Sequence, residues 1–178
     1  MEKQNINYAL SSDDLYRILE NKTNIIDYKK LYNINNIDDV IKDGSCIILY
    51  TTGEKEGITF GHWCCVLTNE KKNLIEFMDP YGFLIDTEIK KFINNDYGEK
   101  NYEGTQLAKL IYNSKYKNIE YNDHKLQQFK KGINTCGRHC ASRILFKELD
   151  LENYVQLIKK VGYKNPDIFV LDLTNILI

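Results

Sequence analysis

The chain has 178 residues, of which 43% are hydrophobic and 28% charged, so we expect one globular domain over residues 1–178. A formal net charge of −1 argues against a nucleic-acid partner, and no apolar run approaches the roughly 20 residues of a membrane span. The polar N-terminus and the odd number of cysteines, five, favour a protein of a reducing compartment that is not secreted.

The hydrophobic pattern predicts a mixture of helices and strands. In chain order it predicts a helix at 11–21, a short helix at 37–42, strands at 45–52, 58–69 and 73–80, helices at 86–95 and 104–113, a strand at 118–122, and helices at 135–150, 151–162 and 165–178. The strands are short runs rich in β-branched and aromatic residues, and the helices combine polar caps with apolar spacings of three and four. The predicted fold class is α+β, with a small, mostly antiparallel sheet packed with helices.

Two of the predicted strands bring a histidine and a carboxylate together. His62 lies near the start of the strand at 58–69, and Asp79 lies near the end of the strand at 73–80. These two ends are adjacent in an antiparallel hairpin, so residues 17 positions apart become neighbours. A carboxylate that accepts a proton from one ring nitrogen fixes the tautomer of a histidine and favours its imidazolium form. The pair lacks only a nucleophile.

The segment GINTCGRHC, residues 132–140, supplies the candidate nucleophile Cys136. In a helix from residue 135, positions 136, 139 and 140 share one face, which by itself fits a reactive thiol, a metal site or core packing. A helix N-terminus favours the thiolate of Cys136, and a nearby His62 imidazolium would stabilise it further. We expect Gly137 to leave space beside the sulfur for a substrate backbone.

The ordered motifs GHW, DPYG and TCGRHC resemble those of the adenain-like cysteine proteases, the superfamily of the adenovirus protease and the SUMO-specific proteases. In that family a Trp follows the catalytic histidine, the acid lies in an acid-Pro-Phe-Gly turn, and the nucleophile begins a helix. The resemblance spans roughly residues 61–149 and implies a papain-like core of the adenain type with Cys136, His62 and Asp79 as a catalytic triad. Compact size and heavy use of Asn, Lys and Ile favour a viral or virophage maturation protease.

The resemblance implies two further site residues and a class of substrate. A glutamine upstream of the nucleophile donates to the oxyanion, and of Gln127 and Gln128 we expect Gln128 to take this role beside the Cys136 amide. Trp63 is expected to roof a narrow channel that admits glycine. The implied substrates are viral capsid or other structural precursors with glycine near the cleaved bond. We expect processing in the host cytoplasm or a viral factory, packaging in the virion, no cofactor, and compatibility with a peptide activator.

Three alternatives stay open at this level. The first is a deconjugating protease for a ubiquitin-like or SUMO-like modifier. The second is a structural zinc site, and the third is a module that only binds a partner. The zinc ligands would come from His62, Cys64 or Cys65, Cys136, His139 and Cys140. We expect instead that Cys46, Cys64, Cys65 and Cys140 are core residues and that His139 lies on a helix surface.

Overall fold

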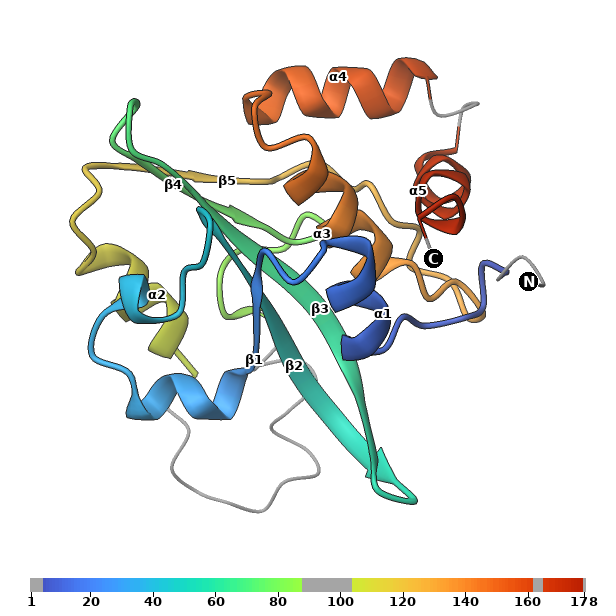
Figure 1. Ribbon diagram of the computed structural model, residues 1–178, viewed down its shortest axis with the longest axis horizontal. Coiled ribbons are helices and arrows are strands. Elements are labelled where there is room, and N and C mark those ends of the chain that lie inside the picture. The colour runs from blue at the N-terminus through green and yellow to red at the C-terminus, as the bar shows by residue number, and fades with distance from the viewer. Residues whose placement is uncertain (1–4, 88–103, 162–164, 178) are drawn as a thin grey trace.

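The computed structural model describes residues 5–87, 104–161 and 165–177 (Figure 1). Its elements are α1 (Ser12–Ile18), β1 (Asn24–Asp27), the 3₁₀ helices η1 (Tyr28–Asn33) and η2 (Ile37–Asp39), β2 (Ser45–Lys55), β3 (Ile58–Asn69), β4 (Leu74–Met78), α2 (Gln106–Tyr112), β5 (Asn118–Tyr121), α3 (Cys136–Leu145), α4 (Leu151–Val161) and α5 (Pro166–Asn175). The predicted α+β class is confirmed. The helix expected at 86–95 lies almost wholly outside the described residues. No helix within the described ranges is both long and apolar enough to cross a bilayer.

A five-stranded sheet in the order β1-β2-β3-β4-β5 forms the centre of the fold. The three middle strands are antiparallel, as predicted, and β1 and β5 add a parallel strand at each edge. β1 was not predicted, because its four residues give too little pattern to distinguish a strand from a loop. The β3–β4 ladder ends at the pair Cys65–Met78, so Asp79 leaves the sheet directly beside the middle of β3.

Helices cover both faces of the sheet, and β3 supplies side chains to both cores (Figure 1). Trp63, Cys65 and Leu67 pack in the core shared with α1, α3, α4 and α5. Cys64 and Val66 pack in the core shared with η1 and α2. This alternation follows from the two-residue period of a strand, and it places the adjacent cysteines on opposite faces. The expectation that Cys46, Cys64, Cys65 and Cys140 are core residues is confirmed, because each is fully buried.

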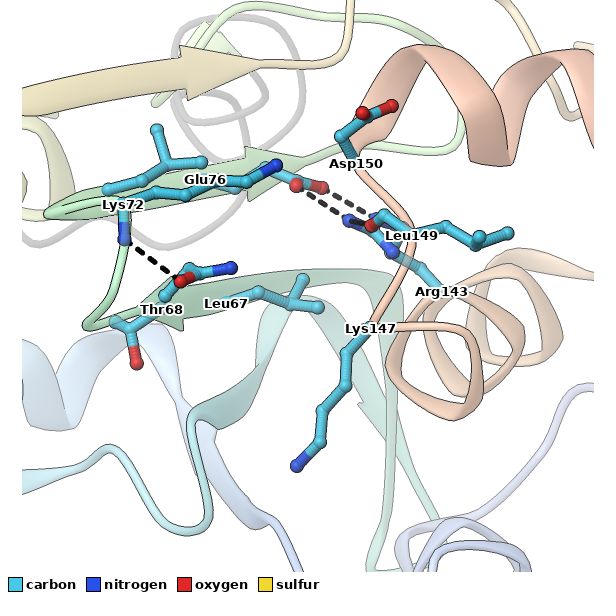
Figure 2. A pocket seen from close by; sticks show the side chains of 10 residues that line it. Leu67, Thr68, Lys72, Glu76, Arg143, Lys147, Leu149 and Asp150 are labelled. Carbon is cyan, nitrogen blue, oxygen red and sulfur yellow. Dashed lines mark hydrogen bonds and ion pairs between the residues drawn. The ribbon is translucent and has the colours of Figure 1, made fainter.

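A buried ion pair joins α3 to the sheet (Figure 2). Arg143 donates from Nε and Nη2 to the two carboxylate oxygens of Glu76 on β4, at 2.7 and 2.8 Å. The same guanidinium donates to the carbonyl oxygens of Phe146 and Leu149, each at 2.9 Å. A planar guanidinium suits this bidentate arrangement, and its remaining protons satisfy the end of the helix. The C-terminal end of α3 is therefore anchored, which fixes how its N-terminal end approaches β3.

Candidate active site

The structure places His62 and Asp79 in contact at the edge of the β3–β4 hairpin. Nε2 of His62 lies 3.3 Å from Oδ1 of Asp79. Both residues are buried, with 7% and 0% of their surface exposed. The ring of Tyr81 stacks on the imidazole, with the two centroids 4.6 Å apart and the planes 15° from parallel. The imidazole is thus held at one edge by a carboxylate and on one face by an aromatic ring.

The DPYG turn itself holds the Asp79 carboxylate in place. The Tyr81 amide donates to Oδ1 at 2.6 Å, and the Cys64 thiol donates to Oδ2 at 3.4 Å. The backbone carbonyl of Asp79 accepts from the Gly82 amide at 2.9 Å and from Nδ2 of Asn122 at 2.7 Å. Gly82 has a φ of +74°, a conformation that glycine adopts without a steric penalty. Both oxygens of the carboxylate are therefore oriented before any ligand binds.

Cys136 is the first residue of α3 and lies between two hollows in the surface. It lines a pocket of about 200 Å³ together with His62, Tyr81 and Gln127. It also lines a groove of about 440 Å³ together with Phe60, Trp63 and the N-terminal segment 9–13. The helix start leaves backbone N–H groups that favour a negative charge at this position. Cys136 thus lines the same pocket as the imidazole and also borders the adjoining groove.

Trp63 and Gly137 lie against each other beside this groove. Nε1 of Trp63 donates to the carbonyl oxygen of Leu10 at 3.2 Å. A Cβ atom at position 137 would lie 3.2 Å from Cδ1 of Trp63 and 3.3 Å from Cβ of Leu10. The expectation that Gly137 leaves open space is therefore wrong, because indole and leucine occupy that space. The glycine instead lets α3 approach β3 closely.

The structure separates the two candidate glutamines. Gln127 is buried and lines the pocket with His62 and Cys136, and its Nε2 donates to the carbonyl oxygen of Ile133 at 3.2 Å. Its Oε1 has no hydrogen-bond partner within the described chain. Gln128 points elsewhere, and its Nε2 donates to Oδ1 of Asn165 at 3.3 Å in an exposed position. The preference for Gln128 does not fit this geometry, because Gln127 and not Gln128 lines the pocket.

His139 is buried, and the expectation that it lies on the helix surface is wrong. It lies one turn after Cys136 on the inner face of α3, and its Nε2 is 3.1 Å from Oδ1 of Asp167. Burial lowers the pKa of His139 below its ordinary value. Burial also raises the pKa of Asp167, but hydrogen bonds from His139 and Thr135 outweigh it and hold that pKa below its ordinary value. The pair is therefore a neutral imidazole that donates to an ionised carboxylate.

Comparison of the sequence with known proteins identifies one relative. No family model matches the sequence. The chain is 35% identical over 152 residues to the uncharacterized protein V9 of the Sputnik virophage, covering 84% of this chain and 83% of that one. The chain belongs to the V9 family.

Solved structures show what fold this member of the V9 family has. The ASFV pS273R protease matches with a TM-score of 0.50 at 11% identity, over 99% of this chain and 70% of that one. The SUMO protease Ulp1 matches with a TM-score of 0.38 at 12% identity, over 94% of this chain and 79% of that one. The first of these similarities shows that the chain shares the fold of the ASFV pS273R protease, in agreement with the α+β fold expected from the sequence.

One group of side chains in the described part of the chain could hold a metal ion. A nitrogen of His62, the sulfur of Cys64 and an oxygen of Asp79 lie within 4.8 Å of one another, and all three residues are buried. The other three ligands named for a structural zinc site, Cys136, His139 and Cys140, are outside this group. His139 instead binds Asp167, and the pKa of the Cys140 thiol is raised by burial, which disfavours the thiolate that a metal would require.

Three residues of this region had no assigned role from the sequence. Asp167 and Thr135 are fully buried beside the start of α3, and Tyr81 stacks on His62. The pattern NPD at residues 165–167 did indicate a helix start, with Asn165 as the cap and Pro166 in the first turn. Nothing local in the sequence distinguishes a buried aspartate in such a turn from an exposed one.

Proposed function

We propose that this V9-family protein is a cysteine endopeptidase, with Cys136 as nucleophile, His62 as general base and acid, and Asp79 as the residue that orients His62. The observation that carries the proposal is the shared pocket: Cys136 and His62 line it together, while Nε2 of His62 contacts Asp79. Because Asp79 engages Nε2, Nδ1 is the ring nitrogen assigned to proton exchange with the thiol.

The reaction proceeds in two half-reactions. The Cys136 thiol gives its proton to His62, and the thiolate forms a bond to the peptide carbonyl carbon. The imidazolium then protonates the amide nitrogen as the C–N bond breaks, which releases the amine and leaves a thioester on Cys136. His62 next takes a proton from a water molecule as the oxygen of that water attacks the thioester carbonyl carbon. The C–S bond breaks, the new acid leaves, and the thiol is restored.

The oxyanion of each tetrahedral intermediate needs hydrogen-bond donors. We assign the Cys136 backbone N–H and Nε2 of Gln127, in place of Gln128. Nε2 carries two protons and uses one for the carbonyl oxygen of Ile133, so the second can reach a ligand in the pocket. A donor that is already in place stabilises the developing charge without reorganisation.

We infer that the substrates are viral structural precursors bound along the groove beside Trp63. The V9 relative comes from a virophage, which favours viral proteins over a cellular modifier. Trp63, Gly61 and the N-terminal segment 9–13 line this groove. We infer that the indole restricts the space beside Cys136, so that a substrate with glycine near the cleaved bond is accepted. Action in the host cytoplasm or a viral factory, packaging in the virion and a possible peptide activator belong to the same proposal.

Alkylation and cleavage together test the proposal. In the absence of metal, iodoacetamide should label Cys136 rapidly at pH 6, and the label should be lost in Cys136→Ala and slowed in His62→Ala. Cys140→Ala is the matched control, because Cys140 lies one turn further on α3 and is fully buried. Peptides with internal glycine, taken from virophage structural proteins, should be cleaved by the wild type and by Cys140→Ala only. An ordinary thiol pH profile at Cys136 would contradict the activated pair. Preferential release of a reporter from a glycine-tailed modifier would replace the precursor substrates with deconjugation.

A further inference from the structure

One buried carboxylate outside the proposed triad accepts three hydrogen bonds from two parts of the site, the start of α3 and the loop at Gln128. Asp167 lies in the first turn of α5 and is fully buried. Its Oδ1 accepts from Oγ1 of Thr135 at 2.5 Å and lies 3.1 Å from Nε2 of His139. Its Oδ2 accepts from the backbone N–H of Gln128 at 3.1 Å. Three donors from distant segments therefore converge on one side chain.

Each of these donors is adjacent to a residue of the proposed chemistry. Thr135 immediately precedes Cys136 and is the N-cap residue of α3, yet its side chain makes no capping bond to the helix. It binds Asp167 instead. Gln128 immediately follows Gln127, so the bond from its amide fixes the backbone that carries the assigned oxyanion donor. His139 lies one helical turn after Cys136 and binds the same oxygen as Thr135.

A second bond from the same helix start reinforces the arrangement. Oδ1 of Asn165 accepts from the Asp167 backbone N–H at 3.1 Å and from Nε2 of Gln128 at 3.3 Å. Gln128 is thus tied to α5 through both its backbone and its side chain. With Gln128 held on α5 in this way, the adjacent Gln127 is the glutamine that lines the pocket. The contact also explains why Gln128 is not the residue that faces Cys136.

We propose that Asp167 is a positioning residue for the peptidase site, which sets the distance between the nucleophile at the start of α3 and the oxyanion donor on the loop at Gln127. The inference rests on the proposed function and deepens it. It gives the C-terminal helix a role in the chemistry, although no atom of α5 contacts the pocket that Cys136 and His62 share.

Position matters here because small displacements are costly in such a site. A donor or nucleophile that moves by about 1 Å can lower a rate by up to roughly 10²-fold. Asp167 is ionised and His139 is neutral, so each of the three donors meets a negatively charged acceptor, and such bonds are stronger than those between neutral groups. The substitution Asp167→Asn would remove that charge, and the amide would present an N–H group to at least one of the three donors.

The test compares Asp167→Asn with Val170→Ala in the full chain. Val170 is fully buried on the same helix, one turn later, and its apolar side chain makes no hydrogen bond to Thr135, His139 or Gln128, so its truncation weakens the packing of α5 and leaves the three bonds to Asp167 in place. Two quantities are measured at matched distance below each variant's unfolding temperature. The first is the pH profile of Cys136 alkylation by iodoacetamide. The second is hydrogen exchange of the Gln128 amide, which does not depend on any activity.

We expect Asp167→Asn to slow alkylation at neutral pH by about tenfold, to move the midpoint of the pH profile, and to speed exchange at Gln128 by at least about tenfold. Val170→Ala should change each quantity by less than about twofold. Equal effects of the two variants, or an unchanged profile in Asp167→Asn, would overturn the inference.

The same measurements on His62→Ala distinguish a failure of the positioning role of Asp167 from a failure of the proposed peptidase function. If His62→Ala slows alkylation but Asp167→Asn does not, only the positioning role fails. If His62→Ala leaves alkylation unchanged, the proposed peptidase pair fails, and the exchange of the Gln128 amide still decides whether Asp167 anchors that loop.

Discussion

Nε2 of His62 lies 3.3 Å from a carboxylate oxygen of Asp79, although the two residues are 17 positions apart. The β3–β4 hairpin accounts for this contact, because its ladder ends just before Asp79 and leaves the carboxylate beside β3. The Tyr81 amide and the Cys64 thiol then fix both oxygens. The relationship needs no contribution from the helices, which makes the hairpin the part of the site that is organised most locally.

Replacing Asp79 with asparagine should remove the orienting charge while preserving shape. Asparagine can present an N–H group to His62 and thereby favour the wrong tautomer, so we expect peptide cleavage to slow by about 10²- to 10⁴-fold. The measurement is kcat on a cleaved peptide, or the alkylation rate of Cys136 at pH 6. Asp86→Asn is the control, since Asp86 is also buried but binds the Ala108 amide and Tyr50 instead. Comparable losses in both variants would show that stability, not orientation, explains the effect.

The two glutamines form a matched pair for the oxyanion assignment. Gln127→Ala should lower kcat by about 10²- to 10³-fold with little change in KM, because the lost bond exists only in the transition state. Gln128→Ala should lower kcat by less than about fivefold, because its side chain binds Asn165 in an exposed position and the backbone bond to Asp167 remains. A larger loss in Gln128→Ala than in Gln127→Ala would reverse the assignment.

The buried ion pair between Glu76 and Arg143 should matter for stability and not for chemistry. Arg143→Met leaves an uncompensated carboxylate and two unsatisfied carbonyl groups, so we expect the free energy of unfolding to fall by about 3–5 kcal/mol. The double variant Glu76→Leu/Arg143→Met should lose less than the sum of the two single changes, because no charge is left unpaired. Urea unfolding gives these values.

Lys147→Met controls for the loss of a positive charge, because Lys147 is exposed and lines a small surface pocket together with Glu76 and Arg143 (Figure 2). It should cost less than about 1 kcal/mol. Strict additivity in the double variant would argue that the buried pair does not act as a unit.

The stability of the fold should fall as the pH is lowered through the range in which free histidine titrates. Burial holds the pKa of His139 below the ordinary value of 6.5, so the unfolded chain binds a proton that the folded chain does not. The free energy of unfolding therefore decreases from about pH 6.5 downward. Asp167, whose pKa is also lowered from 3.8, adds a further loss in the same direction at more acidic pH.

Unfolding temperatures between pH 8 and pH 5 measure this dependence. His139→Gln should flatten the curve in that window, because glutamine does not titrate. His124→Gln is the control for the loss of a histidine, because His124 is partly exposed beside Asp123 and Glu152 and the variant leaves the His139–Asp167 pair intact. If the slope survives in His139→Gln and disappears in His124→Gln, the buried pair does not control acid sensitivity.

Zinc should inhibit alkylation and cleavage through His62, Cys64 and Asp79, whose ligand atoms lie within 4.8 Å of one another. An ion bound there occupies the imidazole that must accept the proton of Cys136. Cys64→Ser should raise the zinc concentration needed for half-inhibition by about tenfold, since a hydroxyl is a poorer ligand for zinc than a thiolate. EDTA should restore activity.

Cys65→Ser is the matched control, because Cys65 is equally buried but faces the other side of β3. If Cys64→Ser and Cys65→Ser need the same zinc concentration for half-inhibition, the inhibitory zinc binds elsewhere, for example to Cys136. Zinc that copurifies in a one-to-one ratio and is required for folding would instead support the structural-metal alternative.

Much of this protein is determined by short-range pattern in its sequence. The hairpin over 58–80 and the helix from residue 135 follow from strand and helix periods, and the structure contains them as β3, β4 and α3. The closeness of His62 and Asp79 also follows, since an antiparallel hairpin leaves few other registers for a turn of this length. The motifs GHW, DPYG and TCGRHC therefore sufficed to identify the fold.

Only the tertiary structure decided which polar residues face the site. Gln127 and Gln128 are identical in type and adjacent in sequence, and the bonds from Gln128 to Asn165 and Asp167 select which one enters the pocket. The sequence predicted that His139 lies on the surface of its helix, but α5 supplies the carboxylate of Asp167 that His139 contacts in the interior. These outcomes depend on where a helix some 30 residues later docks, and local sequence carries no information on that contact because the energy of a buried polar group is set by the partner it meets.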